Sequence, residues 1–353
     1  MSRRMTLLPS HDWSWRRGAW ESYVRLMKRT DWPILVGPWH GEVGFEVLYW
    51  IPFIEQMKAD GISPDRLIPI SRGGASAWYG VPKGLELYAM RTAQQVRVEN
   101  RIQHKKTGLV KQVHVTAFDR QVLKDAAETL GLTRYHTVHP AWMYHNLAPF
   151  WTAARGSEWL GPKVKFPILP VPSTPPSLAL PETFVAVRFY ARDTLPYHDK
   201  LANSFVEATV KTLADQVPVV IFDSTLYLDD HMPFDRKFAG PNIHYVRDMV
   251  ELIPQTNLLV QSAILGKAAG FVGTYGGFAQ LALRIGRPSM SFYTEWGGTS
   301  IAHKHLSDLL STRTNVPFQV FKLGELAMTR SVLPFAETTQ SPQHVGAELA
   351  TVS

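Results

Sequence analysis

Apolar positions along the chain follow two alternating patterns. Short runs of consecutive apolar residues are typical of strands buried on both faces, whereas apolar residues at every third or fourth position are typical of helices. In the first half, these patterns predict strands at 33–37, 66–70 and 110–115 and helices at 45–59, 118–130 and 143–155. Alternation of strands and helices indicates a parallel α/β architecture.

The second half repeats this alternation. It predicts strands at 184–189, 217–222, 242–246, 270–272 and 288–293 and helices at 199–216, 254–268 and 278–285. Between the halves, residues 156–182 contain seven prolines, a density that favours an extended connector. The expected fold class is therefore α/β, with two Rossmann-like domains that face a cleft. The predicted boundaries are 1–31 (N-terminal segment), 32–155 (first domain), 156–182 (linker), 183–330 (second domain) and 331–353 (tail).

Composition narrows the class of protein. The chain has 353 residues and no cysteine, with 45% hydrophobic and 19% charged residues. These values are typical of a globular protein and exclude a disulfide scaffold, thiol catalysis and cysteine-ligated zinc. The apolar stretches are shorter than the roughly 18–20 residues that span a bilayer. Residues 1–31 lack the continuous apolar core of a secretory signal. We expect a soluble, cytoplasmic enzyme.

Positive charge is concentrated at the N-terminus. The net charge is +7, and residues 1–31 hold seven basic and three acidic residues, which is +4 of that total. The nearly neutral remainder argues against a nucleic-acid partner. The same segment carries Trp13, Trp15 and Trp20. We interpret it as a helix whose aromatic residues pack on the first domain. The alternative is peripheral contact with the inner face of an anionic membrane.

The most informative motif follows the strand at 270–272. The small-residue turn Thr274-Tyr275-Gly276-Gly277 leads directly into a helix that includes Gln280. Unpaired amides at a helix N-terminus carry partial positive charge and suit phosphate. Gly276 and Gly277 allow close approach to the backbone, and Thr274 supplies a hydroxyl. A tight structural turn would need the same glycines, so that alternative stays open.

This order of elements resembles a known family. The strand, Gly-Thr-Tyr-Gly-Gly, helix, Gly-x-Pro and strand are similar to the donor-binding half of GT-B type glycosyltransferases. The resemblance covers residues 184–295 and, more loosely, 33–60. It implies that the second domain binds the diphosphate of a nucleotide-sugar through Thr274, Tyr275, Gly276, Gly277 and Gln280. It also implies a glycan or glycoconjugate acceptor on the first domain, and no cofactor besides the nucleotide-sugar substrate.

The loop Gly37-Pro-Trp-His-Gly-Glu-Val-Gly-Phe-Glu46 lies where the resemblance implies acceptor and catalytic groups. Transfer with inversion needs a base that takes the proton of the acceptor hydroxyl. His40, Glu42 and Glu46 are the candidates for this base. Gly41 and Gly44 permit a tight path of the loop near the donor. The alternative for Glu46 is a first-turn carboxylate that complements the helix dipole.

Two strand ends complete the predicted site. Arg188 ends an apolar strand, where its guanidinium is expected to stabilise charge on the leaving diphosphate, and Arg192 is a further donor-binding candidate. The alternative for Arg188 is a salt bridge with Asp193 or Asp223. Asp223 and Ser224 end the next strand and are expected to contact the nucleoside.

The reaction class rests on two departures from common patterns. Retaining GT-B enzymes carry two glutamates eight positions apart, but Glu295 is followed at that spacing by His303, which favours inversion. A D-x-D pair is absent, and the adjacent Asp229 and Asp230 are a weak substitute, so we predict no metal. His303 and His305 are expected in a strand-like surface segment. The main hypothesis is an inverting, metal-independent glycosyltransferase of polysaccharide biosynthesis. The alternatives are a nucleotide-sugar epimerase of the same fold and a non-catalytic sugar-binding protein.

Overall fold

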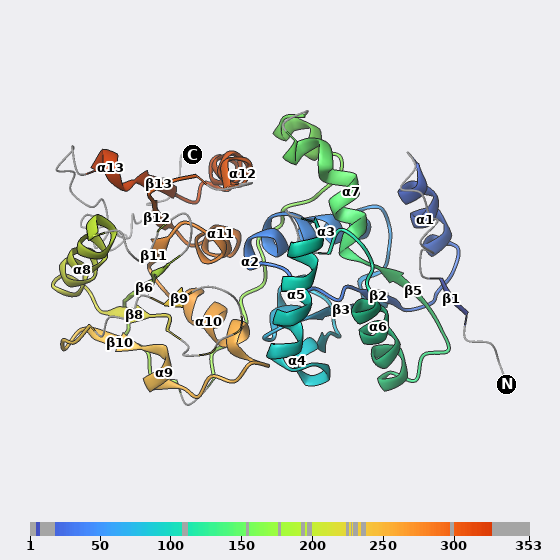
Figure 1. The fold of residues 1–353 in the computed structure, drawn as a ribbon, viewed down its shortest axis with the longest axis horizontal. Helices are drawn as coiled ribbons and strands as arrows, with labels where there is room; N and C mark the ends of the chain where they lie inside the picture. Colours follow the sequence, from blue (N-terminus) through green and yellow to red (C-terminus); the bar gives the residue numbers. More distant parts are fainter. Residues whose placement is uncertain are drawn as a thin grey trace, which may run out of the picture.

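The computed structural model describes residues 5–7, 18–107, 112–152, 155–175, 178–191, 195, 200–223, 226, 228, 232–233, 238–296 and 300–326. It contains two parallel sheets side by side, each with helices packed around it (Figure 1). The predicted fold class, α/β with two Rossmann-like domains, is confirmed. Ser224, Arg192, Asp193, Asp229 and Asp230 lie outside the described residues.

The N-terminal sheet has five parallel strands in the order β1-β5-β2-β3-β4. Their bounds are Met5–Leu7 (β1), Ile34–Val36 (β2), Leu67–Ser71 (β3), Leu85–Glu86 (β4) and Arg134–Val138 (β5). The helices are Ala19–Lys28 (α1), Val43–Phe45 (α2), Ile51–Ala59 (α3), Leu87–Met90 (α4), Ala93–Thr107 (α5), Ala117–Thr129 (α6) and Pro140–Trp151 (α7). The central strand β2 is fully buried, as its unbroken apolar run predicts.

The C-terminal sheet has six parallel strands in the order β10-β8-β6-β11-β12-β13. Their bounds are Val185–Arg188 (β6), Val219–Ile221 (β8), Ile243–Tyr245 (β10), Gly270–Thr274 (β11), Ser289–Tyr293 (β12) and Phe318–Lys322 (β13). The helices are Lys200–Ala214 (α8), Val246–Met249 (α9), Asn257–Leu265 (α10), Gly277–Arg284 (α11), Ser300–Thr314 (α12) and Leu323–Leu326 (α13). Numbered along the chain from β6, this order is 3-2-1-4-5-6, that of the Rossmann fold. A short antiparallel pair, Tyr190–Ala191 (β7) and Met232–Pro233 (β9), forms a separate two-stranded sheet beside β11.

One continuous helical run covers residues 43–59. It consists of α2, a π-helical segment Glu46–Trp50 and α3. Pro52 has no N–H to donate to the preceding turn, which accounts for the interruption of the regular α-helical bonding just before it. The predicted helix at 45–59 is confirmed, and its middle is completely buried because it lies between the two domains.

The domains meet where α2 packs on α11. A Cβ atom added to Gly277 would lie 2.9 Å from Val43 Cβ and 3.0 Å from the Gly44 nitrogen. Arg284 Nε donates to the Val47 carbonyl at 3.1 Å, although the two residues are 237 positions apart. The small residues therefore allow two helix starts from different domains to touch.

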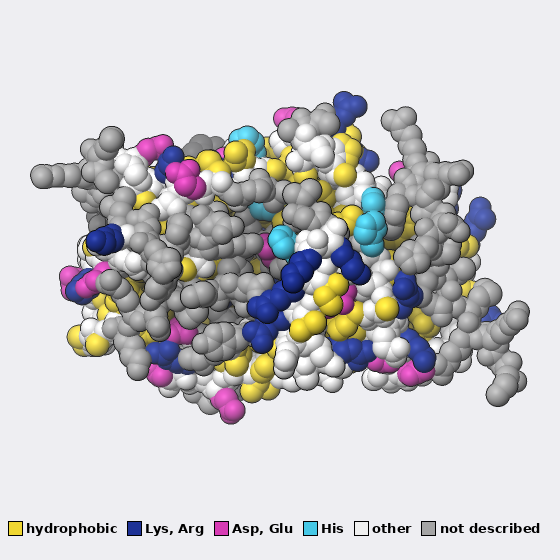
Figure 2. Space-filling view, viewed as in Figure 1, with side chains coloured by type: hydrophobic (Ala, Val, Ile, Leu, Met, Phe, Trp, Pro, Cys, Tyr) yellow, Lys and Arg dark blue, Asp and Glu magenta, His cyan; other side chains and the backbone are white. Residues whose placement is uncertain are grey.

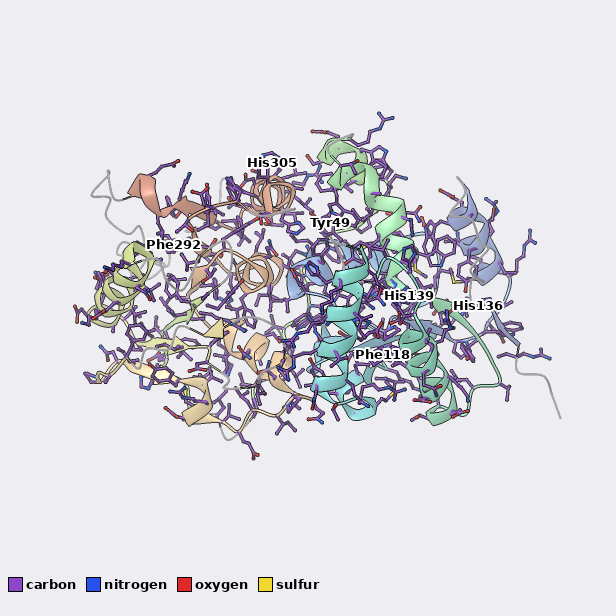
Figure 3. All side chains as sticks on the ribbon, viewed as in Figure 1. Tyr49, Phe118, His136, His139, Phe292 and His305 are labelled. Carbon is purple, nitrogen blue, oxygen red and sulfur yellow. The ribbon has the colours of Figure 1, made fainter. Side chains whose placement is uncertain are left out.

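Several of the sequence-based predictions of secondary structure are wrong. Residues 112–115 form a turn and irregular backbone rather than a strand, and 108–111 lie outside the described part. The strand that pairs with β2 is β5 instead, and its sequence contains too many polar residues to resemble a strand buried on both faces. His303 and His305 are on α12, not on a strand. Tyr49 lies at the domain boundary (Figure 3), where its hydroxyl is 2.7 Å from His303 Nδ1 and His303 is buried.

Residues 19–28 of the N-terminal segment form a helix that packs on the first domain, as the preferred interpretation predicts, whereas Trp13 and Trp15 lie outside the described residues. Tyr23 and Met27 are buried. The Trp20 ring centroid lies 4.6 Å from that of Phe53 and 5.3 Å from that of Trp142. Among the residues that the structure describes, no helix combines the length and apolar character that a bilayer crossing requires.

Candidate active site

The C-terminal sheet reverses its strand order between β6 and β11. In open α/β sheets, ligands bind outside the carboxyl ends of the strands at such a switch point. Arg188 is the last residue of β6 and is the register partner of Gly273 on β11. β11 ends at Thr274, and α11 begins at Gly277. The structure therefore brings together Arg188 and the glycine turn, two features that the sequence placed 86 positions apart.

Arg188 is held in orientation by an amide and an aromatic ring. Its Nη1 donates to Gln261 Oε1 at 3.3 Å, and its guanidinium carbon lies 4.2 Å from the Phe278 ring centroid. Gln261 is fixed in turn, because its Nε2 donates to Asn257 Oδ1 at 2.6 Å. The Arg188 side chain is half-buried. A cation at this depth interacts with an anion more strongly than one in bulk water.

The turn at 274–277 also has contacts within the protein. The buried Thr274 hydroxyl donates to the Tyr190 carbonyl and accepts from the Tyr190 N–H, both at 3.0 Å. A Cβ on Gly276 would collide with the Tyr190 hydroxyl. The Tyr275 hydroxyl donates to the Ser300 carbonyl at 3.0 Å, and burial raises the pKa of Tyr275. The glycines thus have a packing role, and ligand binding at this turn remains a prediction that rests on the first amides of α11.

The second predicted strand end holds an ion pair. Asp223 follows β8, and its Oδ2 accepts from Arg247 Nη1 at 2.5 Å. Both side chains are partly exposed, at 21% and 25% respectively. The carboxylate is therefore oriented by a neighbouring guanidinium and partly exposed, and its contact with a nucleoside stays a prediction.

Glu46 is completely buried in the first domain. Its carboxylate accepts hydrogen bonds from Ser71 Oγ at 2.6 Å, Tyr79 hydroxyl at 2.8 Å and Arg72 Nη1 at 2.8 Å. Burial raises the pKa of Glu46, while the Arg72 charge opposes that rise. Glu46 therefore connects the helical run 43–59 to the end of β3. Glu46 also lies in the first turn of its helical segment, where the sequence-based alternative put it.

Glu42 is the N-cap residue of α2 and is partly exposed. Its charge adds to the effect of burial in raising the pKa of Tyr144. Of the three loop candidates for a base, His40 is 2% exposed and Glu46 is 0% exposed. Glu42 therefore has the best access to an incoming hydroxyl group.

His40 belongs to a buried polar network. Its Nδ1 lies 2.7 Å from Asn100 Oδ1, and its Nε2 lies 3.0 Å from Asp119 Oδ1. The other Asp119 oxygen lies 3.2 Å from His139 Nε2. Burial opposes ionisation of Asp119, but His139 and His40 outweigh it and lower the pKa of this carboxyl. Both ring nitrogens of His40 face oxygen atoms, so neither is available to an acceptor substrate.

The loop and turn glycines sit against other side chains. A Cβ on Gly41 would lie 3.0 Å from the Trp39 ring, and one on Gly44 would collide with Gln280 Oε1. Gln280 is buried, and its Oε1 has no hydrogen-bond partner among the described residues. Gly44 and Gln280, predicted separately as donor-binding residues, therefore meet across the domain boundary.

Sequence reasoning missed three residues that organise this region. Arg72, Asp119 and Gln261 position Glu46, His40 and Arg188, respectively. Two local signals were available. Arg72 lies in a glycine-containing turn directly after a strand, and Asp119 forms a capping box with Thr116 at the start of α6.

Basic side chains gather over α5 on the face in Figure 2. Arg101, His104, Lys105 and Lys106 are exposed on this helix. Asn100 Nδ2 donates to the His40 carbonyl at 2.8 Å, which joins α5 to the loop. In the part of the chain that the structure describes, no three His, Asp or Glu residues are grouped to hold a metal ion.

No protein-family model matches the chain, and no curated protein matches its sequence. Similar solved structures include the dodecameric iron-containing heptosyltransferase TibC in complex with ADP-D-β-D-heptose, at 13% identity and a TM-score of 0.38. A second is the TibC glycosyltransferase from enterotoxigenic E. coli, at 12% identity and a TM-score of 0.36. Each alignment covers 77% of this chain and about 60% of the TibC chain. At this distance the likeness decides neither activity nor substrate.

Proposed function

We propose that this protein is a glycosyltransferase that moves a sugar from a nucleotide-sugar to a glycan or glycoconjugate acceptor. The observation that carries the proposal is the position of Arg188 at the switch point of a Rossmann-ordered sheet, beside the start of α11. A guanidinium and a helix N-terminus together form a site for a diphosphate. Nucleotide-sugars present this diphosphate as their leaving group.

The chemistry divides between the domains. Arg188 stabilises the negative charge that develops on the diphosphate as the glycosidic bond breaks. Glu42, on the facing loop, takes the proton of the acceptor hydroxyl as that oxygen attacks the sugar carbon from the opposite side. This arrangement inverts the configuration of the sugar. With a guanidinium and helix amides available to the leaving group, the proposed reaction needs no metal ion.

Nucleotide binding tests the proposal directly. The intact protein is titrated with UDP, GDP, ADP and CDP in the presence of a chelator, with calorimetry as the readout. We expect one nucleotide to bind and Arg188→Ala to weaken that binding at least about tenfold, since a charge-assisted contact is lost. Lys267→Ala, which removes an exposed cation of the same domain, is the matched control. No binding by any of the four, or equal binding by both variants, would contradict the proposal.

Transfer itself separates the proposed activity from an epimerase. A glycosyltransferase releases nucleoside diphosphate faster when an acceptor is present, whereas an epimerase interconverts the donor without an acceptor. Chelator is included throughout. Loss of turnover that magnesium or manganese restores would show that the metal-independent part of the proposal is wrong and would direct attention to Asp229 and Asp230.

A further inference from the structure

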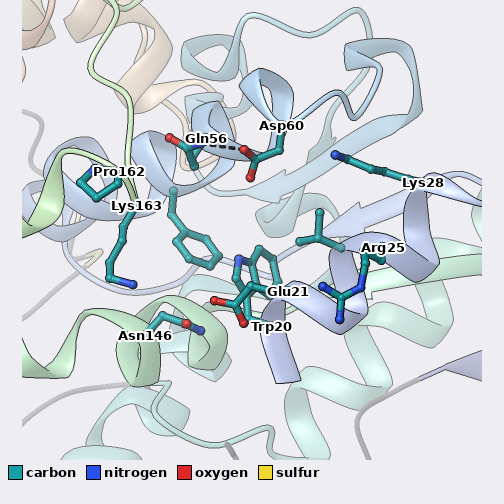
Figure 4. Close-up of a pocket in the computed structure, with 11 residues that line it drawn as sticks. Trp20, Glu21, Arg25, Lys28, Gln56, Asp60, Asn146, Pro162 and Lys163 are labelled. Atoms are coloured by element: carbon teal, nitrogen blue, oxygen red, sulfur yellow. Dashed lines mark hydrogen bonds between the residues drawn. The ribbon is translucent and has the colours of Figure 1, made fainter. Parts of the chain in front are cut away.

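A pocket of about 270 Å³ lies on the first domain between α1 and α3 (Figure 4). Trp20, Glu21 and Arg25 line it from α1, and Phe53 and Gln56 line it from α3. Asn146 of α7, Pro162 and Lys163 also line it. This volume is slightly below the usual range for small-molecule sites, which suits a ligand of one ring rather than a whole nucleotide.

The pocket has an aromatic floor. The Trp20 and Phe53 ring centroids are 4.6 Å apart with their planes at 35°. Phe53 is 3% exposed, whereas Trp20 is half-buried and so retains an accessible ring surface. Such a surface packs against flat, apolar faces, for example the C–H face of a sugar ring.

Polar groups surround this floor. Gln56 Nε2 donates to Asp60 Oδ1 at 2.8 Å, while Gln56 Oε1 is shielded from solvent and has no hydrogen-bond partner among the described residues. Asn146 donates through Nδ2 to the Trp142 carbonyl at 2.8 Å, which orients the amide. Glu21 is exposed at the rim and supplies a carboxylate. An apolar floor with carboxylate and amide groups around it matches the two kinds of surface on a pyranose, whose hydroxyls lie around the edge of the ring.

The pocket lining carries charges of both signs, with the cations Arg25, Lys28 and Lys163 and the carboxylates Glu21 and Asp60. Arg25 Nη2 already donates to Ser22 Oγ at 2.8 Å. The carboxylates of Glu21 and Asp60 are acceptors for sugar hydroxyls, and the cations are donors to sugar oxygens.

The helical run 43–59 links this pocket to the candidate active site. Val43 touches α11 at the domain boundary, and Gln56 is in the pocket, 13 residues further along. At about 1.5 Å per residue, the separation along the helix is about 20 Å. We propose that the pocket binds a sugar unit of the acceptor glycan, several units away from the one that receives the transferred sugar. The acceptor role rests on the proposed function, but sugar binding by the pocket does not.

Saturation-transfer NMR on the intact protein tests the pocket. The probes are the methyl glycosides of glucose, galactose, mannose and N-acetylglucosamine, with no nucleotide present. We expect saturation to reach at least one probe, and Trp20→Leu to abolish it. Trp32→Leu, another half-buried tryptophan of this domain that does not line the pocket, is the matched control. Thermal unfolding verifies that both variants are folded.

A second variant avoids the packed floor altogether. Glu21→Gln changes only an exposed rim group and is expected to weaken probe binding about tenfold, as loss of a charged hydrogen-bond acceptor does. Absence of transfer to all four probes, or unchanged binding by both Trp20→Leu and Glu21→Gln, would overturn the inference. If only the nucleotide titration fails, the proposal that the pocket binds a sugar still holds, but the sugar is no longer assigned to an acceptor. Failure of the sugar probes alone would leave the glycosyltransferase proposal intact.

Discussion

The two sheets reverse strand order in the same way, but they use the two switch points differently. In the N-terminal sheet the reversal lies between β2 and β5, where His40 and His139 follow the strand ends. Asp119 lies between the two rings, and all three residues are at most 2% exposed. In the C-terminal sheet the corresponding position holds the half-buried Arg188 and the start of α11.

The difference shows that topology alone does not create a ligand site. At the N-terminal switch point, the polar groups bond to one another and fill the space that a ligand would need. This network fixes the loop that carries Glu42. At the C-terminal switch point, Arg188, Gly276 and Gly277 are each partly exposed. The same strand order therefore carries a closed polar network in one domain and the proposed anion site in the other, because the side chains differ.

The largest expected change in the free energy of unfolding comes from the buried polar network at the N-terminal switch point. Asp119→Ala leaves two buried imidazoles without their shared carboxylate, and loss of one partner of a buried charged network costs about 3–5 kcal/mol. Urea unfolding followed by circular dichroism measures this change in the free energy of unfolding. Asp125→Ala, on the same helix, breaks a partly exposed ion pair with Arg91 and is expected to cost about 0–1 kcal/mol. Equal costs for the two variants would mean that the buried network has no special role in stability.

Glu42 tests whether the loop held by the buried His40–Asp119 network takes part in catalysis. Glu42→Gln is expected to slow transfer about 100-fold or more, the usual contribution of a general base. Nucleotide affinity should stay unchanged, since Glu42 belongs to the opposite domain. Steady-state kinetics and the nucleotide titration measure these two effects separately. Normal transfer by this variant would mean that the loop is only structural.

The turn at 274–277, at the C-terminal switch point, leaves no room for a side chain at Gly276 beside Tyr190. Gly276 has φ 164°, which any residue adopts, so the cost of Gly276→Ala comes from its collision with the Tyr190 hydroxyl. We expect a destabilisation of about 1–3 kcal/mol. Tyr190→Phe removes the colliding oxygen and should recover part of this loss. A double-mutant cycle of unfolding free energies measures the coupling, and additive effects would show that the two residues do not interact.

The smallest expected effect is the pH dependence of the contribution that Asp119 makes to the free energy of unfolding. The folded-state pKa of Asp119 lies below its ordinary value near 3.9, so its stabilising contribution is present above about pH 4 and is lost as the pH falls further. Unfolding free energies of the wild type and Asp119→Asn, measured from pH 6 to pH 3, should differ less toward the acid end. A constant difference would mean that Asp119 does not titrate with folding.

Much of the architecture followed from local pattern. Runs such as Pro33–Gly37 and Phe184–Phe189 predicted the central strands, because strands buried on both faces must be apolar throughout. Arg188 and the turn at Gly276 were identifiable as strand ends for the same reason. In contrast, α5 was missed because its sequence is mostly polar, and β5 was missed because His136 and Thr137 are buried polar residues in a strand.

The contacts of the candidate-site residues were decided only by the tertiary structure. His40 meets Asp119 across 79 positions, Arg188 meets Gln261 across 73, and Gly44 meets Gln280 across the domain boundary. Periodicity in a sequence reports how deeply a position is buried, because burial repeats with the geometry of a helix or strand. It does not report which distant side chain lies opposite. That pairing, which left Glu42 accessible and made His40 and Glu46 internal, depends on how the two domains pack.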